Sequence, residues 1–82
     1  MNELKLYYYP TCPYCRKVTK FIDRNDLEEI ELKNINQDQK AESELIEIGG
    51  KRQVPCLFID GEPLYESDDI ISWLKRNVVE DS

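Results

Sequence analysis

The 82-residue sequence contains no histidine and no apolar run approaching the roughly 20 residues of a membrane-spanning helix. Without imidazole, every zinc site that uses histidine ligands is excluded. The polar start of the chain is followed by no apolar stretch of the kind that a targeting segment carries. We therefore expect a cytoplasmic protein that does not enter a membrane.

The chain also lacks an excess of positive charge. Its 11 basic and 17 acidic residues give a formal charge of −6, which argues against nucleic acid or an anionic membrane surface as partner. The composition is that of a globular protein, with 40% hydrophobic residues, three glycines and four prolines. Because a chain of this size can bury only one compact core, we expect residues 1–82 to form a single domain. We also expect the protein to be a monomer.

Cysteine is scarce, but two of the three cysteines form the motif Cys12-x-x-Cys15. An odd number of cysteines and so short a loop do not suit the disulfide framework of a small secreted protein. In the cytosol, a C-x-x-C pair is more often redox-active or metal-bound than structural.

The first half of the sequence alternates between strand and helix patterns. Residues 4–9 alternate with period two and end at Pro10, which predicts a strand. Residues 13–24 place apolar side chains on one helical face. Residues 28–35 alternate again, which predicts a second strand. The pair Asn36 and Gln39 resembles a capping box that opens a second helix. The apolar face of this helix contains Ala41, Leu45 and Ile48, and Gly49-Gly50 is expected to end it.

The second half predicts two strands and a last helix. Residues 54–59 form a short apolar run typical of a buried strand, and Asp60-Gly61 is a hairpin signal. Residues 62–65 should return antiparallel at a sheet edge, since Pro63 lacks a backbone donor. Ser67 is expected to cap a helix whose apolar face includes Ile70, Ile71, Leu74 and Val78. The order β-α-β-α-β-β-α predicts an α/β fold with one mixed sheet and helices against it.

The position of the cysteines predicts unequal chemistry. Cys12 lies at the start of a helix, where unpaired N–H groups and the helix dipole favour a thiolate. We expect Cys12 to be the nucleophile and Cys15 to resolve the mixed disulfide that Cys12 forms. The alternative is a zinc site, but the only further thiolate is Cys56, so such a site would need a carboxylate or a second chain.

Charge is distributed unevenly along the chain. Residues 5–24 carry five basic residues against Asp23, whereas residues 25–49 carry eight acids against two bases. Lys51 and Arg52 add a second basic pair before Val54. We leave two interpretations open for Arg16, Lys17, Lys51 and Arg52: they belong to a solvated face, or they attract a small anion and stabilise the thiolate.

Three motifs in this order resemble a dithiol glutaredoxin. They are Cys12-Pro13-Tyr14-Cys15, then Val54-Pro55 before an apolar strand, then Ser67-Asp68-Asp69-Ile70 at a helix start. The resemblance spans nearly the whole chain. It implies a thioredoxin-like fold with a four-stranded mixed sheet, helices on both faces, and a cis peptide bond before Pro55.

The resemblance also implies a glutathione site. Glutathione would serve as co-substrate, with no metal. Val54 would pair its backbone with the cysteinyl unit, Ser67 would bind the γ-glutamyl carboxylate, and Asp68 would take the ammonium group. The residues implied to bind glutathione are Tyr14, Gln53, Val54, Pro55, Ser67 and Asp68.

Some positions depart from the family pattern. Tyr9 stands where many glutaredoxins carry a lysine, and Gln53 replaces a usual threonine. Glu66 replaces a common glycine, and Glu66-Ser67 resembles the pair found in the N-terminal domain of glutathione transferases. Those enzymes also carry a large helical C-terminal domain, for which 82 residues leave no room. Cys56 is expected to be a buried strand residue that acts as a small hydrophobe, with a regulatory or adventitious disulfide as the lesser alternative.

These features predict a glutathione-dependent oxidoreductase that reduces protein–glutathione mixed disulfides and protein disulfides through Cys12 and Cys15. Its partners would be glutathione and disulfide-containing or glutathionylated proteins. Two alternatives stay open. The protein could be an electron donor recharged by thioredoxin reductase, which the Tyr9 departure favours, or a non-enzymatic, glutathione-assisted iron-sulfur carrier with Cys12 as ligand.

Overall fold

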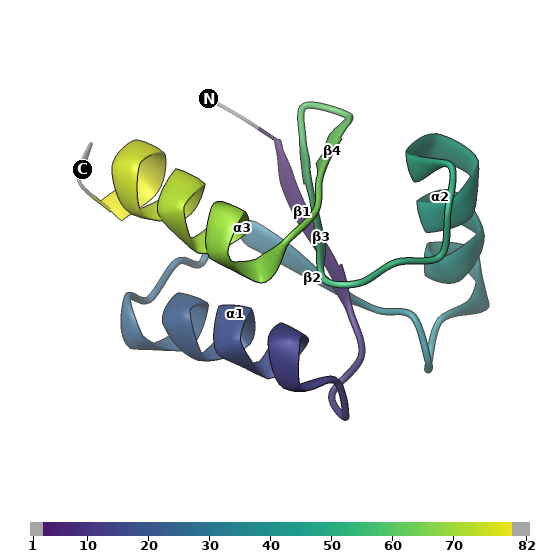
Figure 1. Ribbon diagram of the computed structural model, residues 1–82, viewed down its shortest axis with the longest axis horizontal. Helices are drawn as coiled ribbons and strands as arrows, with labels where there is room; N and C mark the ends of the chain where they lie inside the picture. The colour runs from purple at the N-terminus through teal and green to yellow at the C-terminus, as the bar shows by residue number, and fades with distance from the viewer. Residues whose placement is uncertain (1–2, 80–82) are drawn as a thin grey trace.

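A four-stranded mixed sheet lies between α2 on one face and the pair α1 and α3 on the other (Figure 1). The computed structural model describes residues 3–79. Its strands are β1 (Leu4–Tyr8), β2 (Ile30–Asn34), β3 (Cys56–Ile59) and β4 (Glu62–Leu64). Its helices are α1 (Pro13–Arg24), α2 (Gln39–Gly49) and α3 (Ser67–Leu74), which continues as a π-helical turn, η1 (Lys75–Val79). The expected α/β order is confirmed, and so are helices on both faces.

The strands lie in the order β2-β1-β3-β4. β1 pairs parallel with β2 and antiparallel with β3, and β3 pairs antiparallel with β4. The hairpin between β3 and β4 turns at Asp60 and Gly61, whose φ angles of 52° and 89° suit a tight turn of this kind. Pro63 lies in the edge strand β4, as expected of a residue that cannot donate to a central ladder.

Side chains that alternate between the two faces of the sheet divide the hydrophobic core into two clusters. Leu6 on β1 and Leu57 on β3 face α1 and α3, whose buried side chains include Val18 and Ile70. Successive strand residues point to opposite faces, so Tyr7 lies in the second cluster. That cluster, under α2, contains Tyr7, Ile35, Ala41, Leu45, Cys56 and Phe58. Cys56 is fully buried there, as its strand pattern predicted.

The start of α2 differs from the expectation. The helix is capped by Asp38 rather than by Asn36: the Asp38 carboxylate accepts hydrogen bonds from the N–H groups of Lys40 at 3.0 Å and Ala41 at 3.3 Å. Asn36 instead belongs to the preceding turn, where its N–H donates to Asn34 Oδ1. Both residue types cap helices well, and the carboxylate two residues later has the fitting geometry.

The apolar face and the end of α2 were predicted in part. Ala41 and Leu45 are buried, but Ile48 is 53% exposed, although its side chain lines a cavity beside Phe58 on the α2 face of the sheet. Gly50 ends the helix with a φ of 83°, and its N–H donates to Ile46 O. This left-handed cap confirms the expected glycine stop.

Two further boundaries shift. β3 begins at Cys56 rather than at residue 54, since Val54 and Pro55 precede the first ladder pair, Tyr7 with Cys56. Pro55 has no N–H to donate to a ladder. At the other end, α3 changes to the π-helical turn η1 after Leu74, although Val78 still packs against the first cluster as predicted. Within residues 3–79, no helix is long and apolar enough to cross a bilayer.

Candidate active site

Cys12 lies at the junction between β1 and α1. Its extended backbone, with φ −82° and ψ 121°, places it at the N-cap of the 12-residue helix, and Pro13 is the first helical residue. The Cys12 N–H donates to Tyr9 O at 3.3 Å, which closes the loop after the strand. Proline suits the first helical position because no intrahelical partner exists there for an N–H. The thiol therefore lies at the positive end of the α1 dipole, as expected.

The surroundings of Cys12 stabilise its thiolate. Burial works against the charged form, since the residue is only 7% exposed. Hydrogen bonds from Cys15 and from the backbone of Tyr14 outweigh this cost and lower the pKa of Cys12 below its ordinary value. The side chain of Tyr9 provides a further hydrogen bond that acts in the same direction. Tyr9 thus supports the thiolate at the position where a lysine was expected.

Cys15 has the opposite character. Its side chain is fully buried one turn into α1. Burial, and then the hydrogen bond to Cys12 and the negative charge of Cys12, raise the pKa of Cys15 to about 12. Cys15 is therefore a protonated donor next to a thiolate acceptor. The two cysteines are free thiols in the structure.

A groove of about 380 Å³ collects all six residues that were predicted to bind glutathione. It is lined by Tyr14, Gln53, Val54, Pro55, Glu66, Ser67 and Asp68. The peptide bond between Val54 and Pro55 is cis, which confirms that expectation. Three segments far apart in the sequence thus meet at one groove: the first turn of α1, the loop before β3 and the N-terminus of α3.

The N-terminus of α3 is built differently from the predicted cap. Glu66 occupies the N-cap position with a φ of 70°, and no side chain caps the helix. Ser67 is the first helical residue, and it is 8% exposed. The prediction that the Ser67 hydroxyl caps α3 is therefore wrong. The backbone N–H groups of this helix end carry no side-chain cap and adjoin the groove, which suits a carboxylate ligand.

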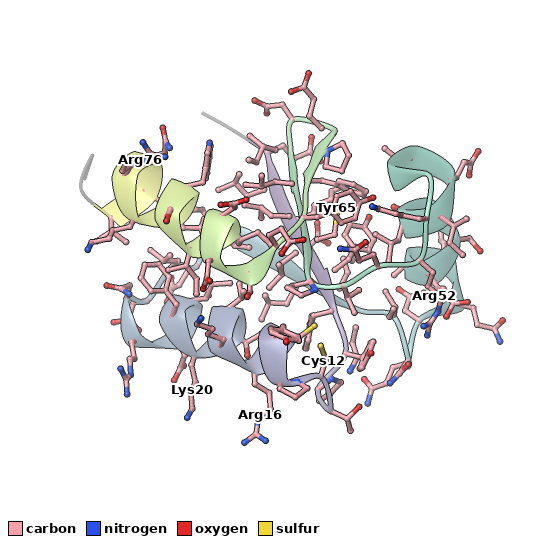
Figure 2. The ribbon with its side chains drawn as sticks, viewed as in Figure 1. Cys12, Arg16, Lys20, Arg52, Tyr65 and Arg76 are labelled. Carbon is pink, nitrogen blue, oxygen red and sulfur yellow. The ribbon has the colours of Figure 1, made fainter. Side chains whose placement is uncertain are left out.

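The basic residues near the site either contact other side chains or point away from the protein. Lys17 Nζ forms an ion pair with Asp68 Oδ1 at 2.5 Å. Arg52 Nε lies 3.2 Å from Glu42 Oε2, and its guanidinium lies 6.0 Å from the centre of the Tyr9 ring. Arg16 points away from the body of the protein, as does Lys20 further along α1 (Figure 2). The solvated-face interpretation therefore holds for Arg16, while Lys17 and Arg52 interact with other elements.

Residues 4–64 match the family model described as Glutaredoxin. The chain belongs to the glutaredoxin family. Glutaredoxin 1 of Rickettsia prowazekii is 34% identical over 78 residues, which cover 93% of this chain and 81% of that protein. The family, together with the Cys12 and Cys15 geometry, supports a thiol oxidoreductase.

Solved structures share the glutaredoxin fold. Oxidised glutaredoxin 2 from Chlamydomonas reinhardtii superposes with a TM-score of 0.67 at 26% identity, covering 98% of this chain and 78% of the other. Glutathione transferase Omega 3C from Trametes versicolor superposes with a TM-score of 0.80 at 24% identity, covering 98% of this chain and 35% of the transferase. The second likeness concerns the fold alone.

A contact behind the glutaredoxin groove holds its loop in place. The Tyr65 hydroxyl donates to Gly49 O at 2.8 Å, which ties the end of α2 to the segment between β4 and α3. Lys51 Nζ lies 4.5 Å from the centre of the Tyr65 ring. Because Lys51 opens the loop that carries Gln53 and Val54, Tyr65 anchors that loop from behind. Sequence analysis did not single out Tyr65, since its partners lie 14 to 16 positions away along the chain.

Glu66 is the groove residue that the predicted site omitted. Two features of the sequence could have indicated that Glu66 belongs to the groove: it replaces a glycine common in the family, and it lies directly before Ser67. A positive φ in a residue other than glycine is itself uncommon and clusters at functional sites.

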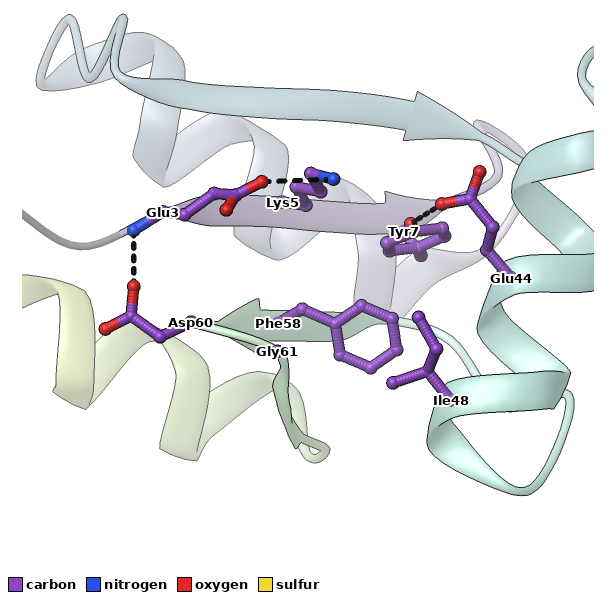
Figure 3. A pocket seen from close by; sticks show the side chains of 8 residues that line it. All are labelled: Glu3, Lys5, Tyr7, Glu44, Ile48, Phe58, Asp60 and Gly61. Atoms are coloured by element: carbon purple, nitrogen blue, oxygen red, sulfur yellow. Dashed lines mark hydrogen bonds and ion pairs between the residues drawn. The ribbon is translucent and has the colours of Figure 1, made fainter.

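A second, smaller cavity of about 220 Å³ lies on the α2 face of the sheet (Figure 3). Tyr7 and Phe58 form its apolar wall, with ring centroids 4.9 Å apart. The Tyr7 hydroxyl donates to Glu44 at 2.9 Å, and Lys5 pairs with Glu3 at 3.1 Å. These polar groups satisfy one another, so the cavity is part of the contact between α2 and β1. Within residues 3–79, no three cysteine, aspartate or glutamate side chains gather as metal ligands would.

Proposed function

We propose that this glutaredoxin is a glutathione-dependent thiol–disulfide oxidoreductase that reduces protein–glutathione mixed disulfides and protein disulfides. The observation that carries the proposal is the position of Cys12, an acidic thiol at a helix N-terminus beside the groove of Tyr14, Val54, Ser67 and Asp68. Glutathione is proposed as co-substrate. Its partners would be glutathionylated or disulfide-containing proteins.

The reaction begins with attack by the Cys12 thiolate on the glutathionyl sulfur of a mixed disulfide. A bond forms between Cys12 Sγ and that sulfur, and the protein thiolate leaves and takes a proton from solvent. The thiolate of a second glutathione then attacks the glutathionyl sulfur on Cys12. This step regenerates the Cys12 thiolate and yields glutathione disulfide. One free glutathione thiol is consumed for each protein thiol released, and the other half of the glutathione disulfide comes from the substrate.

Protein disulfides require Cys15. After Cys12 has attacked, it carries no charge, and the part of the pKa rise of Cys15 that comes from the Cys12 charge disappears. The thiol of Cys15 then loses its proton more readily and attacks Cys12 Sγ. The substrate leaves as a thiol, and a Cys12–Cys15 disulfide remains for reduction by two glutathione molecules.

In the groove, each end of glutathione would have a matching partner. The backbone of Val54 would pair with the cysteinyl unit, and Gln53, Pro55 and Tyr14 would line that segment. The N–H and hydroxyl groups of Ser67 would bind the γ-glutamyl carboxylate at the start of α3, where the helix dipole favours an anion. Asp68 would bind the ammonium group through a charge-assisted hydrogen bond.

The test is turnover of a small glutathionylated disulfide with glutathione and glutathione reductase. We expect Cys15→Ser to keep this activity and Cys12→Ser to lose it. Turnover that persists in Cys12→Ser would refute the mechanism. Activity of the unmodified protein in this assay, with none when thioredoxin reductase replaces glutathione and its reductase, would support glutathione as the electron source.

The Tyr9 departure favours one second candidate, a glutaredoxin-like donor recharged by thioredoxin reductase. Arg52, whose guanidinium lies 6.0 Å from the centre of the Tyr9 ring, also pairs with Glu42, so its charge is shared with a carboxylate. The thioredoxin reductase arm of the same assay tests this candidate directly. A third, a glutathione-assisted iron-sulfur carrier with Cys12 as ligand, would be dismissed if anaerobic reconstitution gave no visible chromophore.

We further propose that the protein acts as a monomer in the cytoplasm. An odd number of cysteines, two of them in a C-x-x-C pair, suits a compartment that keeps thiols reduced, and a net charge of −6 suits neither nucleic acid nor an anionic membrane. Sedimentation and cell fractionation test the two statements.

A further inference from the structure

An ion pair spans the groove end of the two helices α1 and α3. Lys17 Nζ lies 2.5 Å from Asp68 Oδ1, and the two residues are 51 positions apart in the chain. Lys17 follows Tyr14 by three residues on α1, so both lie on the same side of that helix. Tyr14 and Asp68 line the groove, and Lys17 reaches its Asp68 end from α1.

This pair occupies the carboxylate that the proposed function assigns to the ligand. The γ-glutamyl group ends in an α-ammonium, which has the same charge and the same donor type as the lysine ε-ammonium. The two cations therefore compete for the Asp68 carboxylate.

The exposure of the pair makes the exchange easy. The side chain of Asp68 is 80% exposed and that of Lys17 is 55% exposed. Exposed ion pairs contribute little because water screens them and ordering a long side chain costs entropy. A ligand ammonium can displace Lys17 at small cost, and Lys17 can return when the ligand leaves.

We infer that Lys17 is a specificity-determining residue that holds Asp68 while the groove is empty and so weakens the preference for a ligand with a free α-ammonium. The inference rests on the proposed glutathione function. It assigns to Lys17 a role distinct from thiolate stabilisation or general attraction of anions. A cation further along α1 should not share that role.

The experiment compares two mixed disulfides of one peptide thiol. One carries glutathione, and the other carries glutaryl-cysteinylglycine, which keeps the γ-glutamyl carboxylate but lacks the α-amino group. The measured quantity is kcat/KM for release of the peptide thiol, expressed as the ratio between the two disulfides. General effects of charge on folding or on Cys12 act on both substrates and cancel from this ratio.

We expect Lys17→Met to raise the ratio by about two- to fivefold, the range that exposed ion pairs span. Lys20→Met is the matched control, because Lys20 is an exposed cation of the same helix that points away from the protein; its ratio should equal that of the unmodified protein. Asp68→Asn should bring the ratio close to one, with no further change when Lys17→Met is added.

An unchanged or lowered ratio in Lys17→Met would overturn this inference, and so would an equal rise in Lys20→Met. Those outcomes leave the proposed function intact as long as the unmodified protein releases the peptide. Failure of the unmodified protein to release it from either disulfide would overturn the proposed function, and the role of Lys17 with it.

Discussion

Cys12 and Cys15 lie one helical turn apart, yet their thiols differ in acidity. Both are buried, and burial alone would raise the pKa of each. The difference has two causes: Cys15 is the more deeply buried, and it donates a hydrogen bond to Cys12, whereas Cys12 accepts hydrogen bonds at the helix start. The acidity of the Cys12 thiol is therefore a property of the pair.

The first prediction follows from this dependence. Cys15→Ala removes a donor to the Cys12 thiolate, so the pKa of Cys12 should move up toward its ordinary value. At neutral pH, the rate of Cys12 alkylation by iodoacetamide should fall several-fold, and thiolate absorbance should appear at higher pH. Cys56→Ala is the control, because it leaves the Cys12 contacts in place. Equal alkylation profiles for Cys15→Ala and the unmodified protein would contradict the prediction.

At the scale of elements, two capping residues competed in the sequence before α2. Asn36 was expected to cap the helix because Gln39 follows three residues later, whereas the structure uses Asp38. Residue type alone does not tell whether Asn36 or Asp38 caps the helix, because both side chains accept hydrogen bonds from free N–H groups.

The second prediction tests this cap. Asp38→Ala should lower the free energy of unfolding by about 1 kcal/mol, because the N–H groups of Lys40 and Ala41 lose their acceptor. Asn36→Ala, the matched control, should cost clearly less. Chemical denaturation measures both, and a larger loss in Asn36→Ala would reverse the assignment.

The third prediction concerns the contact between α2 and the segment after β4. A Cβ at position 49 would lie 2.5 Å from the Tyr65 hydroxyl oxygen, so Gly49→Ala forces that side chain to move. We expect a loss of about 1 to 3 kcal/mol in unfolding free energy. Tyr65→Phe alone should cost about 1 kcal/mol through the hydrogen bond to Gly49.

The double variant gives the sharper result. In Gly49→Ala/Tyr65→Phe the hydroxyl that clashes is absent, so the combined loss should be smaller than the sum of the two single losses. Strict additivity would show that the clash does not govern the effect of Gly49→Ala.

Much of the fold could be predicted because local patterns and tertiary packing agree. Pro13 suits only the start of α1, Gly50 suits only the end of α2, and Asp60-Gly61 suits a hairpin, so these boundaries follow from backbone chemistry. Periodicity could not reveal that Ile48 stays exposed, because exposure depends on how far the sheet extends under the helix.

For the candidate site, the sequence predicted which residues line the groove, but not which side chains contact one another. The six groove residues were implied by the resemblance to glutaredoxins, and they line one groove in the structure. The ion pair between Lys17 and Asp68 and the anchor at Tyr65 join segments distant in sequence, and no local pattern encodes such meetings.

At the scale of the whole molecule, the sheet separates two hydrophobic clusters, and buried thiols lie on its α2 face as well as beside α1. Cys56 belongs to the α2 cluster with Tyr7 and Phe58. Burial raises the pKa of Cys56 to about 11 from an ordinary value of 9.0. Unfolding would expose this thiol to water and let it ionise at its ordinary pKa.

The fourth prediction is a loss of stability at alkaline pH. A thiol whose pKa is raised by folding contributes stability below its unfolded pKa, and that contribution is lost as the pH rises through the folded pKa. The reduced protein should therefore become less stable as the pH rises from 9.0 to about 11. Cys56→Ala should lessen this alkaline loss by roughly 2 kcal/mol. Urea unfolding across that interval measures the slope, and an identical slope in Cys56→Ala would rule out Cys56 as its source.

The backbone at Glu66 has a consequence for how this position can change over time. A φ of 70° favours glycine, yet the residue is a charged glutamate that lines the groove. Glu66→Gly would relax the chain while removing that charge, so a gain in stability and a change in the groove are coupled in one substitution. Selection for stability alone would drive this position toward glycine. A glutamate here therefore leaves the chain with a strained backbone directly beside its groove.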